Sequence, residues 1–187
     1  MSDQKEKDIF QAALEVFAAQ GFDRATMDEI AIKAGVAKGT LFYRYKSKDD
    51  LFLNLIRGAI DLFLSTVRSA TLDLESSSAR LAKAIEIQTE LSYNHPEFTK
   101  LLLSEVWGKH ERQRLFRVNL ETYLNFLQSI IDEGIANNEL RSTDSALLAA
   151  SIFGMTAAAS LHLMLSQDDL HLEDTVQELQ HYLLDGI

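Results

Sequence analysis

The chain has 187 residues, of which 47% are hydrophobic and 25% are charged, so it can bury one good-sized core or two small ones and is not intrinsically disordered. It has no cysteine, which excludes disulfides, thiolate zinc sites and cysteine nucleophiles. With one proline, eight glycines and no run that alternates apolar and polar residues, the sequence predicts an all-α protein.

The formal net charge of −10 is unevenly distributed along the chain. Residues 1–60 hold nine basic and nine acidic side chains, whereas the remaining 127 residues hold nine basic and nineteen acidic ones. The sixteen residues from Lys33 to Lys48 contain five cations and no acidic side chain. A local basic patch on an otherwise acidic molecule is typical of contact with nucleic-acid phosphates, although a solvated helix face has the same composition.

The first eight residues alternate in charge and have no apolar signal-peptide core, so we expect a cytoplasmic protein. Residues 146–165 form an uncharged segment of about twenty residues, which is long enough to span a bilayer. This segment is rich in alanine, contains serine, threonine and histidine, and has no basic cluster beside it. We interpret it as a helix buried in a protein core or a subunit interface, with no membrane partner.

The first helix is expected over about residues 4–20, with Gly21 as a left-handed cap. Thr26 and Glu29 then form a capping box, in which the hydroxyl and the carboxylate satisfy free amides at the start of a second, short helix. Gly35 ends this second helix.

A third helix must begin only three or four residues later and runs over about residues 38–45. Ser47 and Asp50 form a second capping box, which predicts a fourth helix to about residue 70. Polar or helix-breaking residues then separate five more predicted helices, at residues 79–93, 97–108, 111–136, 143–165 and 172–184.

Residues 26–51 together predict a helix-turn-helix, because two short helices joined by a tight glycine turn cross at a steep angle. Small residues are needed where the axes approach, and these are Ala31, Ala34 and Gly35. The apolar plugs beneath the crossing are Ile30, Val36, Leu41 and Tyr45. With the plugs turned inward, the exposed face of the third helix consists of Lys38, Thr40, Tyr43 and Arg44. A polar, basic and aromatic face of this kind is what a recognition helix presents to the major groove.

Three residues beside this face have two interpretations each. Thr26 caps the second helix, and the amides at that helix end are also suited to a phosphate. Gly39 either weakens the third helix or lets its backbone approach the groove wall. Lys48 is a cation at the start of the fourth helix, where the helix dipole disfavours it, and a bound anion would resolve that conflict.

The stretch from Thr26 to Phe52, TMDEIAIKAGVAKGTLFYRYKSKDDLF, closely resembles the DNA-binding signature of the TetR family. The segment FAAQGF at the end of the first helix extends the match over roughly the first fifty-five residues. The resemblance implies about nine helices, with a helix-turn-helix DNA-binding domain in residues 1–50 and an effector-binding and dimerisation domain in residues 51–187. It also implies a homodimeric repressor that a small ligand releases from a palindromic operator.

Carried over by position, the resemblance implies two sets of contacts with double-stranded DNA. Phosphate contacts are expected from Thr26, Tyr43 and Lys48, and contacts at or near base edges from Lys38, Gly39, Thr40 and Arg44. Family members often have tyrosine at the position of Phe42 and histidine at the position of Arg44, so here one phenolic phosphate contact is lost and one positive charge is added. Phe42 and Lys46 complete the predicted DNA-binding set.

The effector site is expected among aromatic and apolar side chains of the middle helices, although core packing is the more frequent explanation for each of them. Such a pocket suits a mainly apolar ligand with one polar group, for example a fatty-acyl compound, an aromatic compound or a cationic drug. The candidates are Tyr93, Phe98, Leu102, Trp107, Phe116, Tyr123, Phe126, Phe153, Met155 and His162.

Small residues in the predicted helix 143–165 would let two helices pack closely, as a dimer interface demands. The resemblance places this interface on the last two helices of each subunit. The candidates are Ala146, Ala150, Gly154, Ala157, Leu161 and Leu179.

Other classes of function fit the sequence less well. An all-α enzyme would need a nucleophile elbow, a phosphate loop or paired catalytic carboxylates beside a base, and the sequence contains none of these. The five histidines show no metal-ligand spacing, so no metal and no cofactor other than the unidentified effector is expected. A DNA-binding regulator without a small-molecule effector is the alternative, and it differs only in whether a ligand changes operator affinity.

Overall fold

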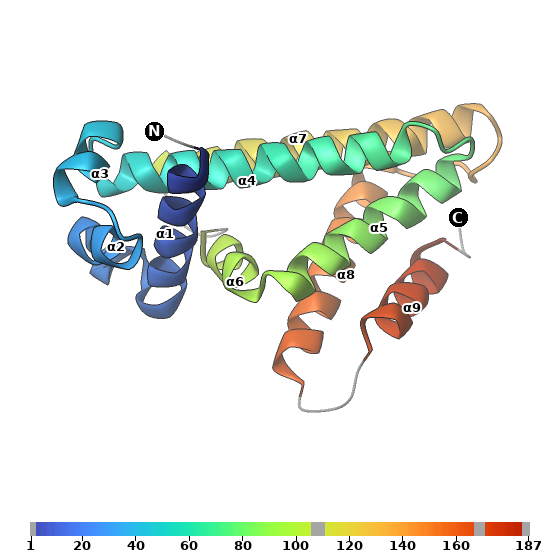
Figure 1. Ribbon diagram of the computed structural model, residues 1–187. Helices are drawn as coiled ribbons and strands as arrows, with labels where there is room; N and C mark the ends of the chain where they lie inside the picture. Colours follow the sequence, from blue (N-terminus) through green and yellow to red (C-terminus); the bar gives the residue numbers. More distant parts are fainter. Residues whose placement is uncertain (1–2, 106–110, 167–170, 185–187) are drawn as a thin grey trace. The chain divides into compact units, whose positions relative to one another are not determined.

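The computed structural model of the protein describes residues 3–105, 111–166 and 171–184, and in these residues it contains nine α-helices and no strand (Figure 1). The prediction of an all-α protein is therefore confirmed. The chain divides into two compact units, of which unit 1 comprises Met1–Asp61 and Glu97–Asn119 and unit 2 comprises Leu62–Pro96 and Leu120–Ile187.

The helices fall close to the predicted ranges. Unit 1 contains α1 (Asp3–Arg24), α2 (Met27–Lys33), α3 (Lys38–Arg44) and most of α6 (Pro96–Glu105). Unit 2 contains α5 (Ser77–Asn94), α8 (Ser145–Leu165) and α9 (Leu172–Leu184). The two long helices α4 (Lys48–Thr71) and α7 (Glu111–Ala136) contribute residues to both units.

The end of α1 differs in detail from the predicted left-handed cap. Gly21 has the expected positive φ of 81°, but its ψ of 161° is extended rather than left-handed helical. This combination of angles is accessible to glycine almost alone, so a glycine is required there in either case. A further short helical turn, as far as Arg24, follows the break.

The predicted capping box of α2 is present in full. The Thr26 hydroxyl accepts a hydrogen bond from the Glu29 amide, and the Glu29 carboxylate accepts one from the Thr26 amide. At the other end Gly35 has a φ of 64°, and the amides of Gly35 and Val36 donate to the carbonyls of Ile32 and Ala31. This pattern is the Schellman motif, and it ends α2 at the predicted glycine.

The start of α4 follows the second capping box with one change. The Asp50 amide donates to the Ser47 hydroxyl at 3.1 Å, as a capping box requires. The Asp50 carboxylate accepts from the Lys46 amide at 2.9 Å, so it reaches one residue further back than the cap itself. Both bonds hold the short connection between α3 and α4.

Three phenylalanine rings form the aromatic centre of unit 1. Phe17 of α1 lies 5.5 Å from Phe22 and 5.2 Å from Phe52 of α4, and Phe22 lies 5.1 Å from Phe52, measured between ring centroids. Two of these pairs meet edge to face, which is a favourable aromatic geometry. The cluster ties the end of α1 to the beginning of α4.

In unit 2, α5 packs against both α8 and α9, and α8 also contacts α9. The apolar centre of this unit includes the fully buried side chains Leu81, Ile85 and Ile152. The turn after α7 is held by Glu139, whose carboxylate accepts a hydrogen bond from the Ser77 amide at the start of α5, at 2.6 Å. Asn138 in this turn has a φ of 59° and so ends α7 in the left-handed conformation.

The apolar helix α8 is long and hydrophobic enough to cross a membrane by length and composition. Within the single chain only 28% of its most hydrophobic stretch is buried, so packing inside this subunit does not explain its composition. Exposed on α8 are Leu147 and Leu165, at 65% and 68%. Of the two sequence interpretations, burial in a subunit interface is the one that this exposure favours.

Candidate nucleic-acid interface

The second and third helices are held by the apolar plugs that the sequence predicts. Ile30 and Leu41 are completely buried and Tyr45 is 3% exposed, whereas Val36 is only half-buried. The contacts of α2 with α1 and α3 place the plugs beneath the crossing of the two short helices. Burial of these residues fixes which face of α3 is left in solvent.

The outward face of α3 consists of the residues predicted for it. Tyr43 is 94% exposed, and Lys38, Thr40 and Arg44 are exposed as well. A side chain added at Gly39 would meet no other atom within 4 Å, so this glycine opens the surface rather than fitting a neighbour. Phe42 is 41% exposed and Lys46 is exposed, so the rest of the predicted set also lies at the surface. The face can therefore meet a flat or grooved partner without rearrangement of the core.

Two cations of this face are paired with carboxylates of neighbouring helices. Lys38 Nζ lies 2.7 Å from an Asp28 carboxylate oxygen of α2, and the Arg44 guanidinium lies 2.5 Å from a Glu6 carboxylate oxygen of α1. The hydrogen bond to Glu6 raises the pKa of Arg44 above its usual value. The positive charge of this face is thus partly offset by two acids.

The Thr26 hydroxyl both accepts and donates a hydrogen bond within the protein. It accepts from the Glu29 amide at 3.2 Å and donates to the Glu29 carboxylate at 2.8 Å. The same carboxylate oxygen accepts from the side-chain amide of Gln20 at 3.1 Å. The hydrogen bond from the Thr26 hydroxyl is the largest cause of the lowered pKa of Glu29, and the other bonds lower it further. The Glu29 carboxylate therefore stays negatively charged beside Thr26, which is predicted to bind a phosphate.

Lys48 has partners that the sequence did not reveal. Its ammonium donates to the main-chain oxygens of Phe22, Asp23 and Ala25, at 2.7, 2.9 and 2.9 Å. These carbonyls lie at and just beyond the end of the first helix, where unpaired carbonyls and the helix dipole favour a cation. The carbonyls resolve the conflict with the α4 dipole, so the anion invoked for that purpose is not needed. The phosphate contact of Lys48 stays a prediction.

The candidate effector residues that the structure describes are distributed over both units. The Tyr123 ring contacts those of Phe63 and Phe153, with centroid distances of 4.9 and 6.4 Å, and the Phe126 ring lies 5.8 Å from the Arg68 guanidinium. Phe98 and Phe116 are buried in unit 1, and Tyr93 is 46% exposed. The side chain of Leu102 and the whole of Trp107 lie outside the described residues.

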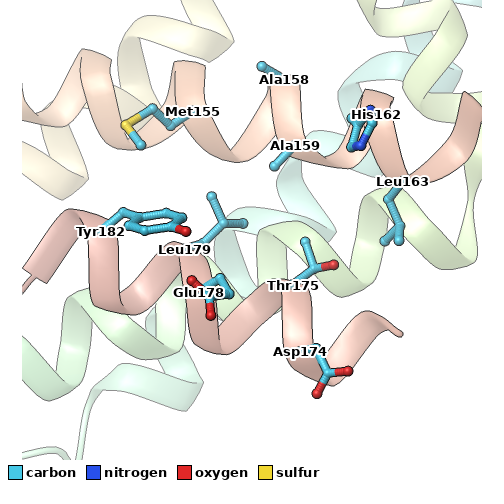
Figure 2. Close-up of a pocket in the computed structure, with 10 residues that line it drawn as sticks. All are labelled: Met155, Ala158, Ala159, His162, Leu163, Asp174, Thr175, Glu178, Leu179 and Tyr182. Atoms are coloured by element: carbon cyan, nitrogen blue, oxygen red, sulfur yellow. The ribbon is translucent and has the colours of Figure 1, made fainter. Parts of the chain in front are cut away.

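Met155 and His162 line a different feature, a groove of about 430 Å³ between α8 and α9. Figure 2 shows Met155 and His162 on α8 opposite Leu179 and Tyr182 on α9. The groove walls are mostly apolar, and His162 is exposed rather than buried. Its remaining lining residues are Ala158, Ala159, Leu163, Asp174, Thr175 and Glu178.

The predicted dimer residues of α8 lie largely at the surface of the single chain. Ala146, Ala150 and Gly154 are exposed, Leu161 is 36% exposed and Ala157 is half-buried. Leu179 of α9 differs from them, because it is 5% exposed and lies in the groove against α8. It therefore offers little surface to a partner.

Sequence reasoning did not single out Glu6, Asp28 or Gln88. The two acids come from other helices, and no local pattern predicts their pairing with Lys38 and Arg44. Gln88 could have been found, because it follows Leu81 and Ile85 on the buried face of α5, where a polar side chain is unexpected. Among the described residues no group of histidines and acids comes together as a metal site.

Comparison with known proteins finds family matches in two segments of the chain. Residues 9–55 match the family described as bacterial regulatory proteins, tetR family, and residues 74–161 match a tetracyclin repressor-like C-terminal domain. The fatty acid metabolism regulator protein of Bacillus subtilis (strain 168) is 30% identical over 150 residues, which cover 78% of this chain and 76% of that protein.

Two of the solved structures with the same fold are of proteins named as regulators. A Clostridium perfringens protein proposed to regulate fatty acid metabolism superposes with a TM-score of 0.88 and 34% identity, over 96% of this chain and 98% of that one. The transcriptional regulator FadR from Bacillus subtilis in complex with stearoyl-CoA superposes with a TM-score of 0.87 and 24% identity, over 97% and 99% of the two chains. With its exposed recognition-helix face and both domains matched, the chain belongs to the TetR family and is a DNA-binding transcriptional regulator rather than an enzyme.

Proposed function

We propose that this regulator is a cytoplasmic, homodimeric repressor that binds a palindromic operator and is released from it by a long-chain acyl-CoA thioester. The observation that carries the DNA-binding part is the exposed face of α3, on which Tyr43 is 94% exposed although it is a large aromatic residue. An aromatic hydroxyl in water beside several cations is suited to a phosphate backbone. In this proposal residues 1–50 bind DNA and residues 51–187 bind the effector and the second subunit.

The proposed DNA contacts fall into two groups. Thr26, Tyr43, Lys46 and Lys48 contact phosphates, with Phe42 packed beside them, and Lys38, Gly39, Thr40 and Arg44 lie at or near base edges. The exposure of the α3 residues supports this division, because side chains from one helix face enter one groove together. Lys48 reaches a phosphate only if one of its three carbonyl bonds is exchanged for that contact.

The proposed dimer interface uses the exposed side of α8. Its small residues let another helix approach closely, and an added side chain at Gly154 would meet nothing within 4 Å. The apolar surface left open by Leu147 and Leu165 is costly in water, and a second copy of the chain would cover it. Both arguments support the interface that the family resemblance implies.

The proposed effector class rests on relatives and on the chemistry of unit 2. The relative that is 30% identical is named a regulator of fatty acid metabolism, and a structure of the same fold holds stearoyl-CoA. The interior of unit 2 offers aromatic and aliphatic side chains, including Phe63, Tyr123 and Phe153, which suit an acyl chain. A regulator without an effector is the second candidate, since nothing in the α3 face depends on a ligand.

The DNA-binding part is tested by fluorescence anisotropy with duplex DNA from the promoter region of the protein's own gene. We expect specific binding that weakens steeply with salt, because phosphate contacts release counterions. Tyr43→Ala should weaken binding at least tenfold with no change in thermal stability, since the side chain is almost fully exposed. Leu72→Ala, at an exposed position of unit 2, is the matched control and should bind as the parent does. Unchanged binding of Tyr43→Ala would show that the DNA face is assigned wrongly.

The effector part is tested by adding stearoyl-CoA to the protein–operator complex. Release of the DNA at a ligand concentration that also raises the melting temperature of the free protein supports the proposal. Stearoyl-CoA that neither binds nor releases DNA contradicts the acyl-CoA assignment. If a broad set of apolar compounds also had no effect, the regulator without an effector would be favoured.

A further inference from the structure

Three buried side-chain atoms of unit 2 have no hydrogen-bond partner among the described residues, and one of them, Nε of Arg80, belongs to a guanidinium that is already paired with Glu133. The other two are the hydroxyl oxygen of Tyr123 on α7 and the amide oxygen of Gln88 on α5. Tyr123 is 3% exposed and Gln88 is 6% exposed, so bulk water does not solvate either side chain freely. A buried polar atom without a partner costs about 1–3 kcal/mol, and proteins rarely tolerate it without a reason.

Other buried polar side chains of the same unit are satisfied locally. The hydroxyls of Thr89, Thr156 and Ser160 each donate to the carbonyl four residues earlier in their own helix, at 2.7 to 2.8 Å. A tyrosine hydroxyl is too far from its own backbone for such a bond. In this core, buried hydroxyls that can reach a carbonyl of their own helix are hydrogen-bonded. The Tyr123 hydroxyl and Gln88 Oε1 have no such partner, and we call them the open atoms.

Both open atoms belong to side chains that contact Phe153 of α8. The Gln88 side-chain amide nitrogen donates to the Phe153 main-chain oxygen at 3.3 Å, which fixes which end of the amide is the free acceptor. The Tyr123 ring lies edge-on to the Phe153 ring, with a centroid distance of 6.4 Å. Gln88 and Tyr123 therefore both border Phe153 of α8, one at its main chain and the other at its ring.

The surroundings of these atoms determine what they can bind. The buried polar residues described in unit 2 are serines, threonines and Gln88, and none carries a charge. Burial raises the pKa of the Tyr123 phenol, so it stays a neutral donor at physiological pH. A carboxylate placed here would be desolvated, and Arg80, a cation of this unit with a buried nitrogen, is already paired with Glu133. Gln88 Oε1 moreover accepts hydrogen bonds only, so its partner must bring an N–H or O–H group.

We propose that Gln88 and Tyr123 are the polar contacts that select an acyl thioester over the corresponding free fatty acid. Gln88 Oε1 accepts from an amide N–H of the pantetheine arm, and the Tyr123 hydroxyl donates to a carbonyl oxygen of the thioester or of that arm. A fatty acid at neutral pH has a carboxylate that cannot donate to Gln88 and would be buried without a counter-ion, with the Tyr123 hydroxyl as its donor. This inference rests on the proposed function, because it assumes an acyl-CoA effector, and it adds the residues that recognise it.

The test compares the full-length wild-type protein with two variants, using stearoyl-CoA and stearic acid in calorimetric titrations and thermal melts. Tyr123→Phe removes only the open hydroxyl, so the melting temperature of the free protein should stay the same or rise. Affinity for stearoyl-CoA should nevertheless fall about fivefold to tenfold, with stearic acid binding weakly to all forms. Gln88→Met should weaken stearoyl-CoA binding by a similar factor.

Thr71→Val is the matched control, because it removes a buried hydroxyl that already bonds to the carbonyls of Val67 and Arg68. It should lower the melting temperature and leave the affinity unchanged, which is the opposite pattern to Tyr123→Phe. Equal stearoyl-CoA affinity in wild type and both test variants would overturn the proposal and assign the open atoms to buried water. Failure of the wild type itself to bind stearoyl-CoA would instead refute the proposed function.

Discussion

The ammonium of Lys48 contacts Phe22 in two ways at once. It donates a hydrogen bond to the Phe22 main-chain oxygen at 2.7 Å and lies 4.5 Å from the centroid of the Phe22 ring. The same ring belongs to the aromatic cluster with Phe17 and Phe52. One lysine at the start of α4 therefore holds the end of α1 through hydrogen bonds and a cation–π contact.

Replacing Lys48 should consequently affect folding as well as DNA binding. Lys48→Met leaves the carbonyls of Phe22, Asp23 and Ala25 without their charged donor, and we expect a loss of about 1–3 kcal/mol in the free energy of unfolding. Urea unfolding followed by circular dichroism measures it. Lys46→Met is the control, since Lys46 is exposed, and it should weaken operator binding and reduce its salt dependence with little change in stability. Equal stability of both variants would mean that water replaces the ammonium at no cost.

Freeing a cation of the α3 face should strengthen operator binding. Asp28→Asn removes the carboxylate that pairs with Lys38, and because the pair is exposed we expect a gain of only about twofold to fivefold in affinity. Anisotropy at fixed salt measures this gain. Asp61→Asn makes the same change in net charge at an exposed position on α4 and separates the loss of the ion pair from the general gain in positive charge. An equal gain in both variants would contradict a specific role for the pair.

The Glu29 carboxylate should make unit 1 sensitive to acid. The hydrogen bonds from Thr26 lower the pKa of Glu29, so the stability it contributes is present above its unfolded pKa of about 4.3. That contribution is lost as the pH falls through the lower folded pKa. Glu29→Gln retains a side chain suited to the capping box and removes the charge. Thermal melts between neutral and acidic pH should show a smaller loss of stability in Glu29→Gln than in the wild type. An equal loss in the two proteins would mean that the Glu29 carboxylate does not cause the acid sensitivity.

The removal of negative charge at Glu29 has a second consequence. Glu29→Gln leaves Thr26 as the N-cap but takes away the anion beside its hydroxyl. If Thr26 contacts a phosphate, operator affinity should rise in this variant at neutral pH. Unchanged affinity would restrict Thr26 to its structural role.

Gly134 of α7 should not tolerate a side chain. A Cβ at this position would lie 2.7 Å from side-chain atoms of Leu140 and 2.8 Å from the Ser77 Cβ of α5. We expect Gly134→Ala to lower the free energy of unfolding by about 1–3 kcal/mol, because the clash outweighs the better helix propensity of alanine. Gly58→Ala is the control in α4, where the nearest neighbour is Phe10 at 3.9 Å, and it should be neutral or stabilising. Chemical unfolding shows whether each variant lowers or raises the free energy of unfolding.

Much of the fold and of the exposed α3 face was predictable because the signals are local. The Thr26–Glu29 capping box and the turn at Gly35 involve residues a few positions apart, and both appear as expected. The outward face of α3 follows from the spacing of Leu41 and Tyr45, whose burial leaves Tyr43 in solvent. Helix periodicity needs no information from elsewhere in the chain.

The contacts that could not be predicted join residues from different helices. No sequence pattern indicates that Glu6 pairs with Arg44, or that Lys48 binds the end of α1 rather than an anion. The open atoms of Gln88 and Tyr123 likewise depend on three helices packing together. The composition of α8 could not distinguish a buried core helix from an interface helix, because both are apolar on all sides.

The sequence by itself determined the helices, the helix-turn-helix and the residues exposed on its recognition helix. These follow from capping, glycine conformation and the period of 3.6 residues, which act over one or two turns of chain. Only the tertiary structure decided which cations are paired, which face of α8 is open and which buried polar atoms lack partners. Those properties depend on the distance between side chains far apart in sequence, and that distance exists only once the helices have packed.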